Sequence, residues 1–366
     1  MKKLLIIGNG SFGKINKKVL INQHTGKLLL DLKKNGINPT MLQCSSSYFI
    51  NKNDNLLDFD LVSNKINFID IVRNSKNIIL YFKNILIIFR ALLNFKYIYI
   101  FSPGTLGLLV GFLGIMFNKK IGLYVRGEFI EKKKFYNFLS KKSNFILTVS
   151  PMLKQMVNNK NISIIKPMIN LNIKSKIYKP YSPKNKIRIL FVGRLEKRKG
   201  IMDLIDMVSI LDLNQISYTV DIVGGGDLYN ELLLNQKRGN ISHDIKFHGL
   251  ISDREKLDSF YNDADLFYFP SHDEGFPRVL YEAMAHSLPI FTTFVGGIPG
   301  YMINAQNCIK IPVRDGMGSS KILISHLEKK DIMCKLSKNA FSMVQNIFNG
   351  NLLDQHILIN NKFYNE

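Results

Sequence analysis

Short apolar runs alternate with longer amphipathic stretches along the whole chain. The short runs predict strands buried on both faces, and the stretches between them have the period of about 3.6 residues that is typical of helices. The predicted strands are Lys3–Ile7, Pro39–Gln43, Tyr97–Phe101, Lys120–Val125 and Phe145–Val149 in the first half, and Ile187–Val192, Thr219–Val223, Ile245–Phe247, Leu266–Phe269, Pro289–Thr293 and Ile309–Val313 in the second. Helices are predicted between them, for example at Leu20–Lys34 and Ile78–Leu93. This alternation predicts an α/β protein with parallel sheets covered by helices on both faces.

With 366 residues, the chain is long enough for two domains of ordinary size. The segment Lys174–Lys186 combines lysines and prolines without an apolar period, and we expect a linker here at residues 179–186. Residues 1–178 then form an N-terminal α/β domain and residues 187–345 a second one. The tail, residues 346–366, has little charge and several large apolar side chains, so we expect it to pack back toward the N-terminal domain.

The apolar segments are too short or too interrupted to predict a membrane span. The N-terminal apolar run is too short for a signal peptide and ends at a glycine-rich stretch. The most apolar region, Ile78–Phe117, contains Lys83, Arg90 and Lys96 and is then broken by Ser102-Pro103-Gly104. Three widely separated cysteines argue against a disulfide framework. We therefore expect a cytoplasmic protein.

The formal net charge of +22 lies in the N-terminal half. Residues 1–180 contain 29 Lys and Arg against 7 Asp and Glu, whereas residues 181–366 contain 21 of each kind. A basic half implies a partner with negative charge, either an anionic membrane or a nucleic acid. The chain shows no helix-turn-helix, RNP or zinc pattern, so charge is the only feature that supports nucleic-acid binding. We therefore do not expect a nucleic-acid partner. The segment Glu131–Lys142 mixes lysines with aromatic residues as interfacial helices do, and we expect it to dock the protein peripherally on an anionic membrane.

Three stretches place glycine beside polar or charged residues at or just after the end of a predicted strand. The first, Gly8-Asn9-Gly10-Ser11-Phe12-Gly13, has the GxGxxG spacing of a dinucleotide-binding turn between a strand and a helix. Such sites hold the ribose with an acidic residue after the second strand, but that strand ends here at Gln43-Cys44-Ser45. We therefore expect a glycine-rich turn whose Gly10, Ser11 and Gly13 contact a substrate other than NAD.

The second stretch, Gly193-Arg194-Leu195-Glu196-Lys197-Arg198-Lys199-Gly200, follows a predicted strand and precedes a predicted helix. Free backbone amides, a helix N-terminus and the charges of arginine and lysine suit a diphosphate. The residues alone leave open that this is a solvated basic loop.

The third stretch, Glu274-Gly275-Phe276-Pro277-Arg278-Val279-Leu280-Tyr281-Glu282-Ala283-Met284-Ala285, places two glutamates eight residues apart. Pro277 suits the first turn of a helix, so Glu274 lies in the preceding loop and Glu282 in the second turn. The loop brings a carboxylate and the amides of Gly275 and Phe276 to the helix N-terminus.

The second and third stretches resemble glycosyltransferase family 4, the retaining GT-B enzymes, over about residues 187–300. GRLEKRKG is similar to the family's GRL…KG loop and EGFPRVLYEAMA to its E-x7-E signature, and IVGGGD at Ile222–Asp227 stands in the family's order. The resemblance implies a GT-B fold, with two Rossmann-like parallel-sheet domains facing each other across a cleft. It also implies sugar transfer, with retention of anomeric configuration, from a nucleotide-diphosphate donor to a glycan acceptor, without a further cofactor.

By this resemblance Arg194, Lys199 and Glu274 are the expected catalytic residues. Arg194 and Lys199 bind the donor diphosphate, Glu274 contacts the donor sugar near the reacting carbon, and Glu282 holds the ribose hydroxyls. The remaining donor contacts are expected at Gly193, Gly225, Gly275, Phe276 and Pro277.

In the first half many family members carry a histidine after a strand, where this chain has Val125-Arg126-Gly127-Glu128-Phe129. Arg126 and Glu128 are candidate contacts to the donor sugar or the acceptor. The alternative is that these two side chains pair with each other at the strand end.

Two features bear on metal use and on the family comparison. Asp263-Ala264-Asp265 has the DxD spacing of metal-dependent glycosyltransferases, but its place between a helix and a buried strand favours a structural role. The histidines show no ligand spacing, so we expect a metal-independent protein.

Ser287 stands where the family usually has glycine, and Gly300 where an acidic residue is frequent.

We expect the acceptor to be a glycan on a lipid carrier, used for a bacterial surface polysaccharide such as capsule or O-antigen. A GT-B sugar-nucleotide epimerase is the nearest alternative, and a nucleic-acid-binding protein is the alternative from another class. EGFPRVLYEAMA favours the transferase.

Overall fold

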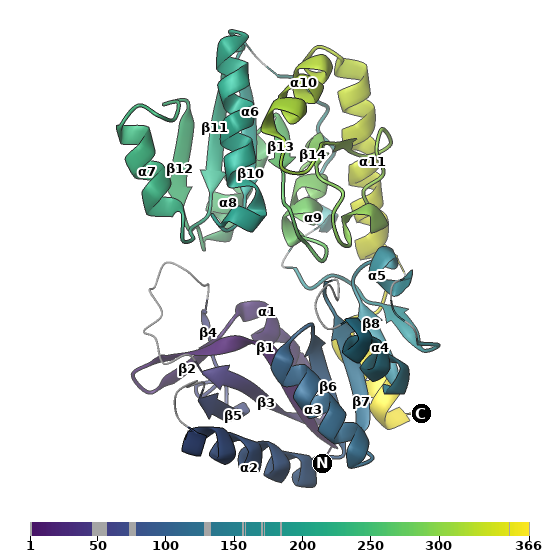
Figure 1. The fold of residues 1–366 in the computed structure, drawn as a ribbon. Coiled ribbons are helices and arrows are strands. Elements are labelled where there is room, and N and C mark those ends of the chain that lie inside the picture. Colours follow the sequence, from purple (N-terminus) through teal and green to yellow (C-terminus); the bar gives the residue numbers. More distant parts are fainter. Residues whose placement is uncertain are drawn as a thin grey trace. The chain divides into compact units, whose positions relative to one another are not determined.

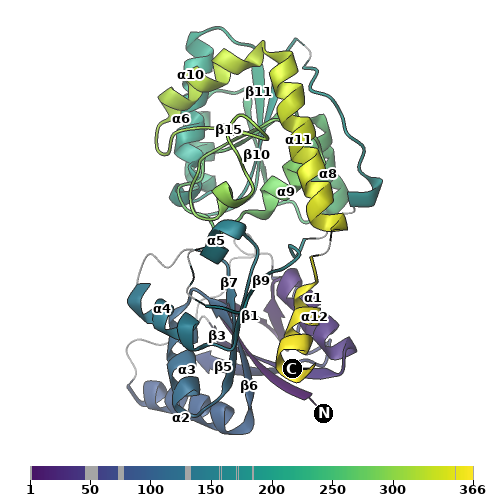
Figure 2. The ribbon, with the colours of Figure 1, turned by 90° about the vertical axis from the view of Figure 1, so that its right-hand side faces the viewer.

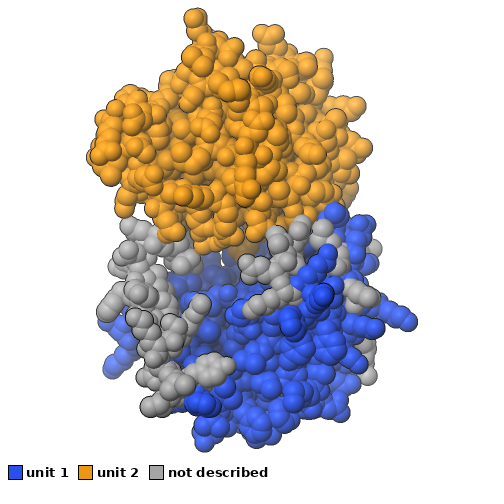
Figure 3. Space-filling model, viewed as in Figure 1, with its two compact units in different colours: residues 1–168, 352–366 blue, residues 169–351 orange. Residues whose placement is uncertain are grey.

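The computed structural model describes residues 2–45, 57–72, 78–127, 133–155, 157, 159–169, 171, 173–183, 185–350 and 352–365. The chain forms two compact units, one of Met1–Met168 with Leu352–Glu366 and one of Ile169–Asn351 (Figure 3). Each unit has its own parallel sheet and its own core. The order of elements along the chain therefore follows the predicted α/β alternation, run twice.

The boundary between the units falls after Met168, ten residues before the predicted boundary at 178. Residues 169–186, which include the predicted linker, belong to the C-terminal unit. The hydroxyl of Tyr178 donates to the carbonyl oxygen of Cys334 at 3.0 Å, and Tyr181 is buried, with 3% of its surface exposed. Prolines and lysines give this segment the composition of a linker, whereas its two tyrosines anchor it to the C-terminal unit.

The N-terminal unit, among the residues described, is built on a 9-stranded sheet. Its parallel strands run in the order β5-β3-β1-β6-β7-β8-β9, and β2 and β4 form an antiparallel branch beside the second half of β1. The strands are β1 (Lys2–Ile15), β2 (Lys18–Ile21), β3 (Ile37–Ser45), β4 (Phe59–Asp60), β5 (Asn67–Val72), β6 (Tyr97–Ser102), β7 (Lys120–Val125), β8 (Phe145–Thr148) and β9 (Ile162–Ile164). The five strands predicted in this half correspond to β1, β3, β6, β7 and β8, and the other four were not predicted.

The glycine-rich stretch of residues 8–13 is not a turn before a helix, and that prediction is wrong. It lies within β1, which passes a bulge between Ile7 and Ser11 and pairs Gly13 with Leu20 of β2. The side chain of Phe12 is buried and meets the ring of Phe68 on β5 edge-on at 5.8 Å. This long-range contact keeps the segment extended, so the first helix begins only at Gln23.

Helices cover both faces of the N-terminal sheet. Figure 2 shows α2, α3 and α4 on one face and α1 and α12 on the other. The helices are α1 (Gln23–Lys34), α2 (Ile78–Asn94), α3 (Thr105–Met116), α4 (Lys133–Lys142), α5 (Pro151–Gln155) and α12 (Gln355–Asn360). Ile88 and Leu92 of α2 join Leu5, Ile98 and Ile100 of the sheet in one buried apolar cluster. The predicted helices at Leu20–Lys34 and Ile78–Leu93 thus correspond to α1 and α2.

The C-terminal residues Leu352–Glu366 belong to the N-terminal unit. They form the yellow segment next to its sheet in Figure 1. The amide of Gln355 donates to the hydroxyl of Tyr99 on β6 at 2.6 Å. A short π-helix, η4 (Asn361–Asn365), places the ring of Phe363 4.7 Å from that of Phe145 on β8. The hydroxyl of Tyr364 donates to the backbone carbonyl of Lys3 at 2.9 Å. This segment is therefore part of the core of the unit.

The C-terminal unit has a 6-stranded, fully parallel sheet in the order β12-β11-β10-β13-β14-β15. The strands are β10 (Ile187–Val192), β11 (Tyr218–Val223), β12 (Ile245–Gly249), β13 (Leu266–Phe269), β14 (Ile290–Thr292) and β15 (Ile309–Lys310). They correspond to the six strands predicted in this half, and β10 and β13 have the predicted bounds.

Helices lie on both faces of this sheet as well, with α6 and α10 on one face and α8, α9 and α11 on the other (Figure 2). The elements are η1 (Ile173–Ser175), η2 (Lys197–Lys199), α6 (Ile201–Leu213), α7 (Tyr229–Lys237), α8 (Arg254–Asp263), α9 (Arg278–Ala285), η3 (Ile298–Gly300), α10 (Gly316–Leu327) and α11 (Lys330–Asn349). In the part of the chain that the structure describes, no helix is both long enough and apolar enough to cross a bilayer.

Candidate functional site

The strand order of the C-terminal sheet marks one place as a binding site. Successive strands are added toward one edge from β10 to β12, and the chain then returns so that β13 to β15 extend the opposite edge. In open α/β sheets the crevice at such a reversal, outside the carboxyl ends of the strands, is where ligands bind. The loops at this point are Gly193–Gly200 after β10 and residues 270–277 after β13, the two stretches that the sequence singles out for the donor.

Backbone contacts hold these two loops together. Gly200 has φ +70°, and a Cβ atom at this position would lie 2.0 Å from the carbonyl oxygen of Pro270. Gly296 has φ +56°, and a Cβ atom there would lie 1.6 Å from the carbonyl oxygen of Glu274. Only glycine allows both the left-handed conformation and this close approach. The Glu274 loop is therefore fixed from two sides by main chain.

The Lys199 ammonium and the Glu274 carboxylate form an ion pair between the two loops. Both side chains are nearly buried, with 13% and 10% of their surface exposed. The hydroxyl of Ser271 donates to the same carboxylate oxygen of Glu274 at 3.0 Å. A lysine and a glutamate 75 residues apart in the chain thus meet at the strand-order reversal, where a cation and a carboxylate are available to one ligand.

The two arginines of the first loop pair with Glu196. Arg194 Nη1 lies 2.8 Å from one oxygen of this carboxylate, and Arg198 Nε lies 2.7 Å from the other. Burial would lower the pKa of Arg198, but the hydrogen bond and the charge of Glu196 outweigh it and raise that pKa. Both arginine side chains are half exposed. Either arginine can therefore turn toward an arriving anion while the other stays paired with Glu196.

The remaining predicted donor residues line the same edge of the sheet. Gly193 follows β10 directly, and the carbonyl oxygen of Gly225 accepts from the amide of Leu195 at 2.8 Å. The loop after β13 carries Gly275, and its Phe276 is buried against Tyr281 at 4.5 Å. Pro277 is the residue immediately before α9, one position earlier than predicted.

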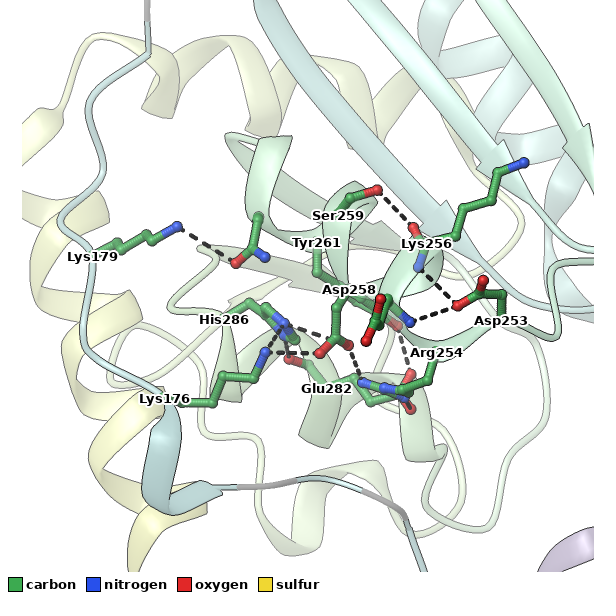
Figure 4. A network of polar contacts seen from close by, with 12 residues as sticks. Lys176, Lys179, Asp253, Arg254, Lys256, Asp258, Ser259, Tyr261, Glu282 and His286 are labelled. Atoms are coloured by element: carbon green, nitrogen blue, oxygen red, sulfur yellow. Dashed lines mark hydrogen bonds and ion pairs between the residues drawn. The ribbon is translucent and has the colours of Figure 1, made fainter.

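Glu282 lies in the second turn of α9, as the sequence predicts, and both of its carboxylate oxygens have protein partners (Figure 4). Arg254 Nη1 donates to Oε1 at 2.6 Å, and the hydroxyl of Tyr261 donates to Oε2 at 2.8 Å. Burial and the neighbouring Glu282 carboxylate raise the pKa of Tyr261 well above its ordinary value, so its hydroxyl remains a donor. Two residues of α8 therefore orient the carboxylate expected to hold a ribose.

This network continues to a buried histidine and a lysine (Figure 4). His286 Nδ1 lies 2.8 Å from the carbonyl oxygen of Glu282, and its Nε2 lies 2.6 Å from Lys176 Nζ. Lys176 also contacts Asp258 at 3.0 Å, and Asp258 contacts Arg254 at 2.5 Å. Burial lowers the pKa of His286 to about 4, against its ordinary value of 6.5, and the Lys176 ammonium adds to this effect. His286 is neutral at physiological pH, with the proton on Nδ1.

One predicted residue of the N-terminal unit, Arg126, lies at the corresponding edge of its own sheet. That sheet also reverses its strand order, between β1 and β6. There Asn9 Nδ2 donates to the carbonyl oxygen of Pro103 at 3.0 Å, and Arg126 donates to Asn9 Oδ1. The guanidinium carbon of Arg126 lies 5.1 Å from the ring of Phe101 and 5.6 Å from that of Tyr124. Arg126 is thus held by Asn9 and two aromatic rings.

Three other predicted contacts in this half differ in their placement. Gly10 lies in β1 next to Gln43, whose amide nitrogen would be 3.8 Å from an added Cβ atom. Ser11 and Gly13 follow in the same strand, paired with Cys44 and Leu20. Glu128 lies outside the described residues, so its pairing with Arg126 stays a prediction.

The aspartates of Asp263-Ala264-Asp265 make structural contacts. Asp265 Oδ2 accepts from the backbone amide of Arg188 at 2.8 Å. The carboxylate of Asp263 lies 3.7 Å from the guanidinium of the same arginine. Over the described residues as a whole, no group of three or more His, Cys, Asp or Glu side chains could hold a metal ion. These contacts account for the DxD spacing.

Sequence reasoning missed the residues that position the charged groups. Arg254 and Tyr261 orient Glu282, and Asn9 holds Arg126. Arg254 directly follows the helix cap Asp253, where an exposed arginine is ordinary, so only the tertiary contact identifies it. Asn9 lies inside a stretch that the sequence assigns to substrate contact through its glycines.

The comparisons with known proteins agree with this geometry. Residues 173–343 match the family model described as "Glycosyl transferases group 1". The amylovoran biosynthesis glycosyltransferase AmsK of Erwinia amylovora is 26% identical over 210 residues, which are 53% of this chain and 50% of that protein. The chain therefore matches about half the length of the curated relatives it resembles.

Solved structures resemble the chain over its whole length. A glycosyltransferase from Rickettsia africae has a TM-score of 0.68 at 19% identity and covers 100% of this chain and 99% of its own. Anabaena Alr3699/HepE, solved in complex with UDP and glucose, has a TM-score of 0.66 at 16% identity with the same coverage. Both units thus have the sheet architecture of these proteins. The chain has the GT-B fold of these proteins, and its residues 173–343 are similar to the glycosyl transferases group 1 family.

Proposed function

We propose that this chain is a retaining glycosyltransferase that moves a sugar from a nucleotide-diphosphate donor to a glycan acceptor. The observation that carries the proposal is the meeting of Lys199 and Glu274 at the strand-order reversal of the C-terminal sheet. A cation in a loop just before a helix N-terminus suits a diphosphate, and a carboxylate next to it suits sugar hydroxyls. The Anabaena relative in complex with UDP and glucose supports a donor of this class.

The donor diphosphate would lie against the Gly193–Gly200 loop. Lys199 and Arg194 supply the positive charge, and in the free protein each is paired with a glutamate that the phosphate oxygens would replace. The ribose would lie at Glu282, whose orientation is set by Arg254 and Tyr261. The backbone amides of Gly275 and Phe276 and the carboxylate of Glu274 remain for the sugar.

The chemistry asked of these residues is electrostatic. As the bond to the sugar breaks, negative charge grows on the leaving diphosphate, and cations preorganised around it lower the barrier. Removing one such contact typically slows a reaction by about 10²- to 10³-fold. In this proposal Arg194 and Lys199 replace a metal ion, and Glu274, released from Lys199, steadies the sugar near its reacting carbon.

The acceptor in this proposal is a glycan on a lipid carrier, at the cytoplasmic face of a bacterial membrane. The relative named for amylovoran biosynthesis supports a role in polysaccharide synthesis. Arg126, held by Asn9 at the edge of the N-terminal sheet, is the proposed contact of that unit with acceptor or donor sugar.

The experiment is thermal unfolding of the full chain with UDP, GDP, ADP or CMP, each in the presence of EDTA. A ligand at 100 times its dissociation constant stabilises a protein by about 2.7 kcal/mol. We expect one diphosphate to raise the midpoint of the wild type. Lys199→Ala should lose this response, and Lys197→Ala, which removes an exposed lysine two positions away, should keep it.

A midpoint that rises only when Mg²⁺ replaces EDTA would contradict metal independence. A response of Lys199→Ala equal to that of the wild type would contradict the assignment of the diphosphate loop. If no nucleoside diphosphate binds but an oligonucleotide does, the basic N-terminal half is a nucleic-acid site and the transferase proposal fails.

A further inference from the structure

Helix α2 is apolar on the side that faces away from the core. Its residues Ile88 and Leu92 are buried against the sheet, whereas Phe82, Leu86 and Leu93 have 61%, 60% and 61% of their surface exposed. Successive residues of a helix are separated by about 100°, so residues 82, 86, 89 and 93 fall on one stripe. Aromatic and leucine side chains in water along three turns of a helix are unusual for a surface that stays free.

The exposed apolar surface continues over the two neighbouring helices. The ring of Phe89 on α2 meets that of Phe117 at the end of α3, at 5.2 Å. On α3, Phe112 stacks on Phe138 of α4 at 5.4 Å and meets Phe135 at 5.9 Å. The outer sides of these helices add further exposed apolar side chains, namely Ile85, Phe89, Leu109, Met116, Phe135 and Phe138. We call this surface of α2, α3 and α4 the apolar helix face; Figure 2 shows the three helices together on one side of the sheet.

Basic side chains border the apolar helix face. The three helices contain six lysines and arginines and no acidic residue. All six are exposed: Lys83, Arg90, Lys133, Lys134, Lys141 and Lys142. On α2 the two basic residues lie about 80–100° from the apolar stripe, where a helix lying in a membrane interface places its cations.

We propose that the apolar helix face binds an anionic lipid bilayer, with α2 as the element that enters it. The apolar stripe would lie among the upper acyl chains, and the six basic side chains would reach the phosphate groups beside it. The sequence predicts docking through the basic N-terminal domain and singles out the segment 131–142 within it. Of that segment Glu131 and Lys132 lie outside the described residues, and the rest forms the basic border of a face that is centred on α2.

Charge distinguishes a bilayer from a second copy of the chain as the occupant. In a two-fold dimer the same face meets itself, so the six cations of one chain would oppose the six of the other. An anionic bilayer instead neutralises them. Residues 1–180 contain 29 basic and 7 acidic residues, and this positive charge attracts the chain to an anionic membrane at longer range.

The chain offers a direct probe, because it contains no tryptophan. In Phe82→Trp the single indole reports on the apolar helix face, and in Leu213→Trp, at an exposed position of the C-terminal unit, it reports on a control surface. With vesicles of phosphatidylcholine and phosphatidylglycerol at low salt, we expect the emission of Phe82→Trp to shift to shorter wavelength and that of Leu213→Trp to stay. Without phosphatidylglycerol, or at high salt, the shift should be much smaller.

Vesicle flotation of tryptophan-free variants measures the affinity itself. Phe82→Ser with Leu86→Ser should lower it about tenfold or more, because two side chains no longer leave water. Leu213→Ser with Leu234→Ser, an equally exposed pair in the C-terminal unit, should leave it unchanged. Lys133→Gln with Lys134→Gln should lower it about fivefold per lysine. No sugar nucleotide is needed, so this test is independent of the proposed transferase activity.

Absence of binding to anionic vesicles at low salt would overturn the proposal. So would binding that Phe82→Ser with Leu86→Ser leaves unchanged. A dimer in sedimentation velocity that these two substitutions dissociate would assign the face to a second copy instead.

Discussion

Acid should destabilise the C-terminal unit through one buried imidazole, that of His286. Its Nδ1 proton is directed at the carbonyl oxygen of Glu282 at 2.8 Å, and its Nε2 lies 2.6 Å from the Lys176 ammonium. The ring stacks on Tyr261 at 5.0 Å and has no exposed surface. A second proton would have to enter at Nε2, directly against the lysine. The Asp258 carboxylate, 3.7 Å away, is shared with Lys176 and Arg254 and compensates only in part.

The magnitude follows from the difference in pKa between the two states. Burial, with the Lys176 charge, lowers the pKa of His286 to about 4 in the folded protein, against 6.5 in the unfolded chain. Well above pH 6.5 neither state is protonated, so the histidine adds no pH dependence there. As the pH falls from 6.5 to 4, only the unfolded chain takes up the proton, and the free energy of unfolding falls by about 1.4 kcal/mol per pH unit. Between pH 7 and pH 4 this one group removes about 3 kcal/mol.

Urea unfolding at a series of pH values isolates this contribution when the wild type is compared with His286→Asn. Asparagine keeps an N–H near the carbonyl of Glu282 but does not titrate. We expect the variant to be less stable at pH 7, since it loses the stacking on Tyr261, and we expect the gap to narrow by about 3 kcal/mol at pH 4. His326→Asn is the control, because His326 Nδ1 makes the same bond, at 2.8 Å, to the carbonyl four residues earlier on a partly exposed helix.

A gap between wild type and His286→Asn that stays constant from pH 7 to pH 4 would refute this reasoning. It would mean that the folded protein protonates His286 as easily as the unfolded chain does. The imidazole proton resonances give a second readout, and those of His286 should remain in their neutral position down to about pH 5.

Three further substitutions test other contacts of the two units by thermal unfolding, with and without the nucleotide that binds. Gly296→Ala should lower the free energy of unfolding by about 2 kcal/mol or more, and should weaken nucleotide binding, because its Cβ would lie 1.6 Å from the Glu274 carbonyl oxygen. Arg254→Met should cost about 1–3 kcal/mol by leaving a buried oxygen of Glu282 unpaired, and should lower affinity for nucleotides more than Arg254→Lys does. Gln355→Ala should cost about 1–3 kcal/mol through the unpaired hydroxyl of a fully buried tyrosine on β6, without any effect on nucleotide binding.

The C-terminal unit was predictable in detail because its signals are local. β10 and β13 are short, mostly apolar runs followed by glycine or proline, and their bounds were predicted to the residue. At Ser287 the backbone conformation was also predictable from a local signal. The resemblance to glycosyltransferase family 4 predicts a glycine there, and the structure gives Ser287 a φ of +61°. A position that requires the left-handed region is marked by glycine in relatives even where this chain has another residue.

The N-terminal unit was harder to predict because its contacts are distant in the sequence. The glycines of residues 8–13 have the spacing of a phosphate-binding turn, yet Phe12 packs on Phe68, 56 residues later, and the chain stays extended. The segment 169–186 was misassigned for a similar reason, since its tyrosines find partners such as Cys334 more than 150 residues away. Composition describes what such a segment contains and not what it packs against.

The same distinction explains which parts of the candidate site could be predicted. Lys199 and Glu274 each follow a strand, and parallel strands bring their carboxyl ends to one edge, so their proximity follows from the α/β alternation. The contacts of Glu282 with Arg254 and Tyr261 do not follow from this alternation. These two residues lie on a different helix, whose rotation about its axis is set by packing.

The way the donor loops are held bears on how a ligand could use them. Backbone contacts at Gly200 and Gly296 fix the two loops, so their placement does not depend on the ion pair between Lys199 and Glu274. In the proposed donor complex a diphosphate would take Lys199, and the ammonium would exchange one anion for another while the main chain stays in place. The Glu274 carboxylate released in this way would keep its hydrogen bond from Ser271 and hence its orientation next to the proposed sugar. A site whose donors and acceptors are placed by main chain needs little reorganisation during the reaction, which is the condition under which electrostatic stabilisation of a transition state is most effective.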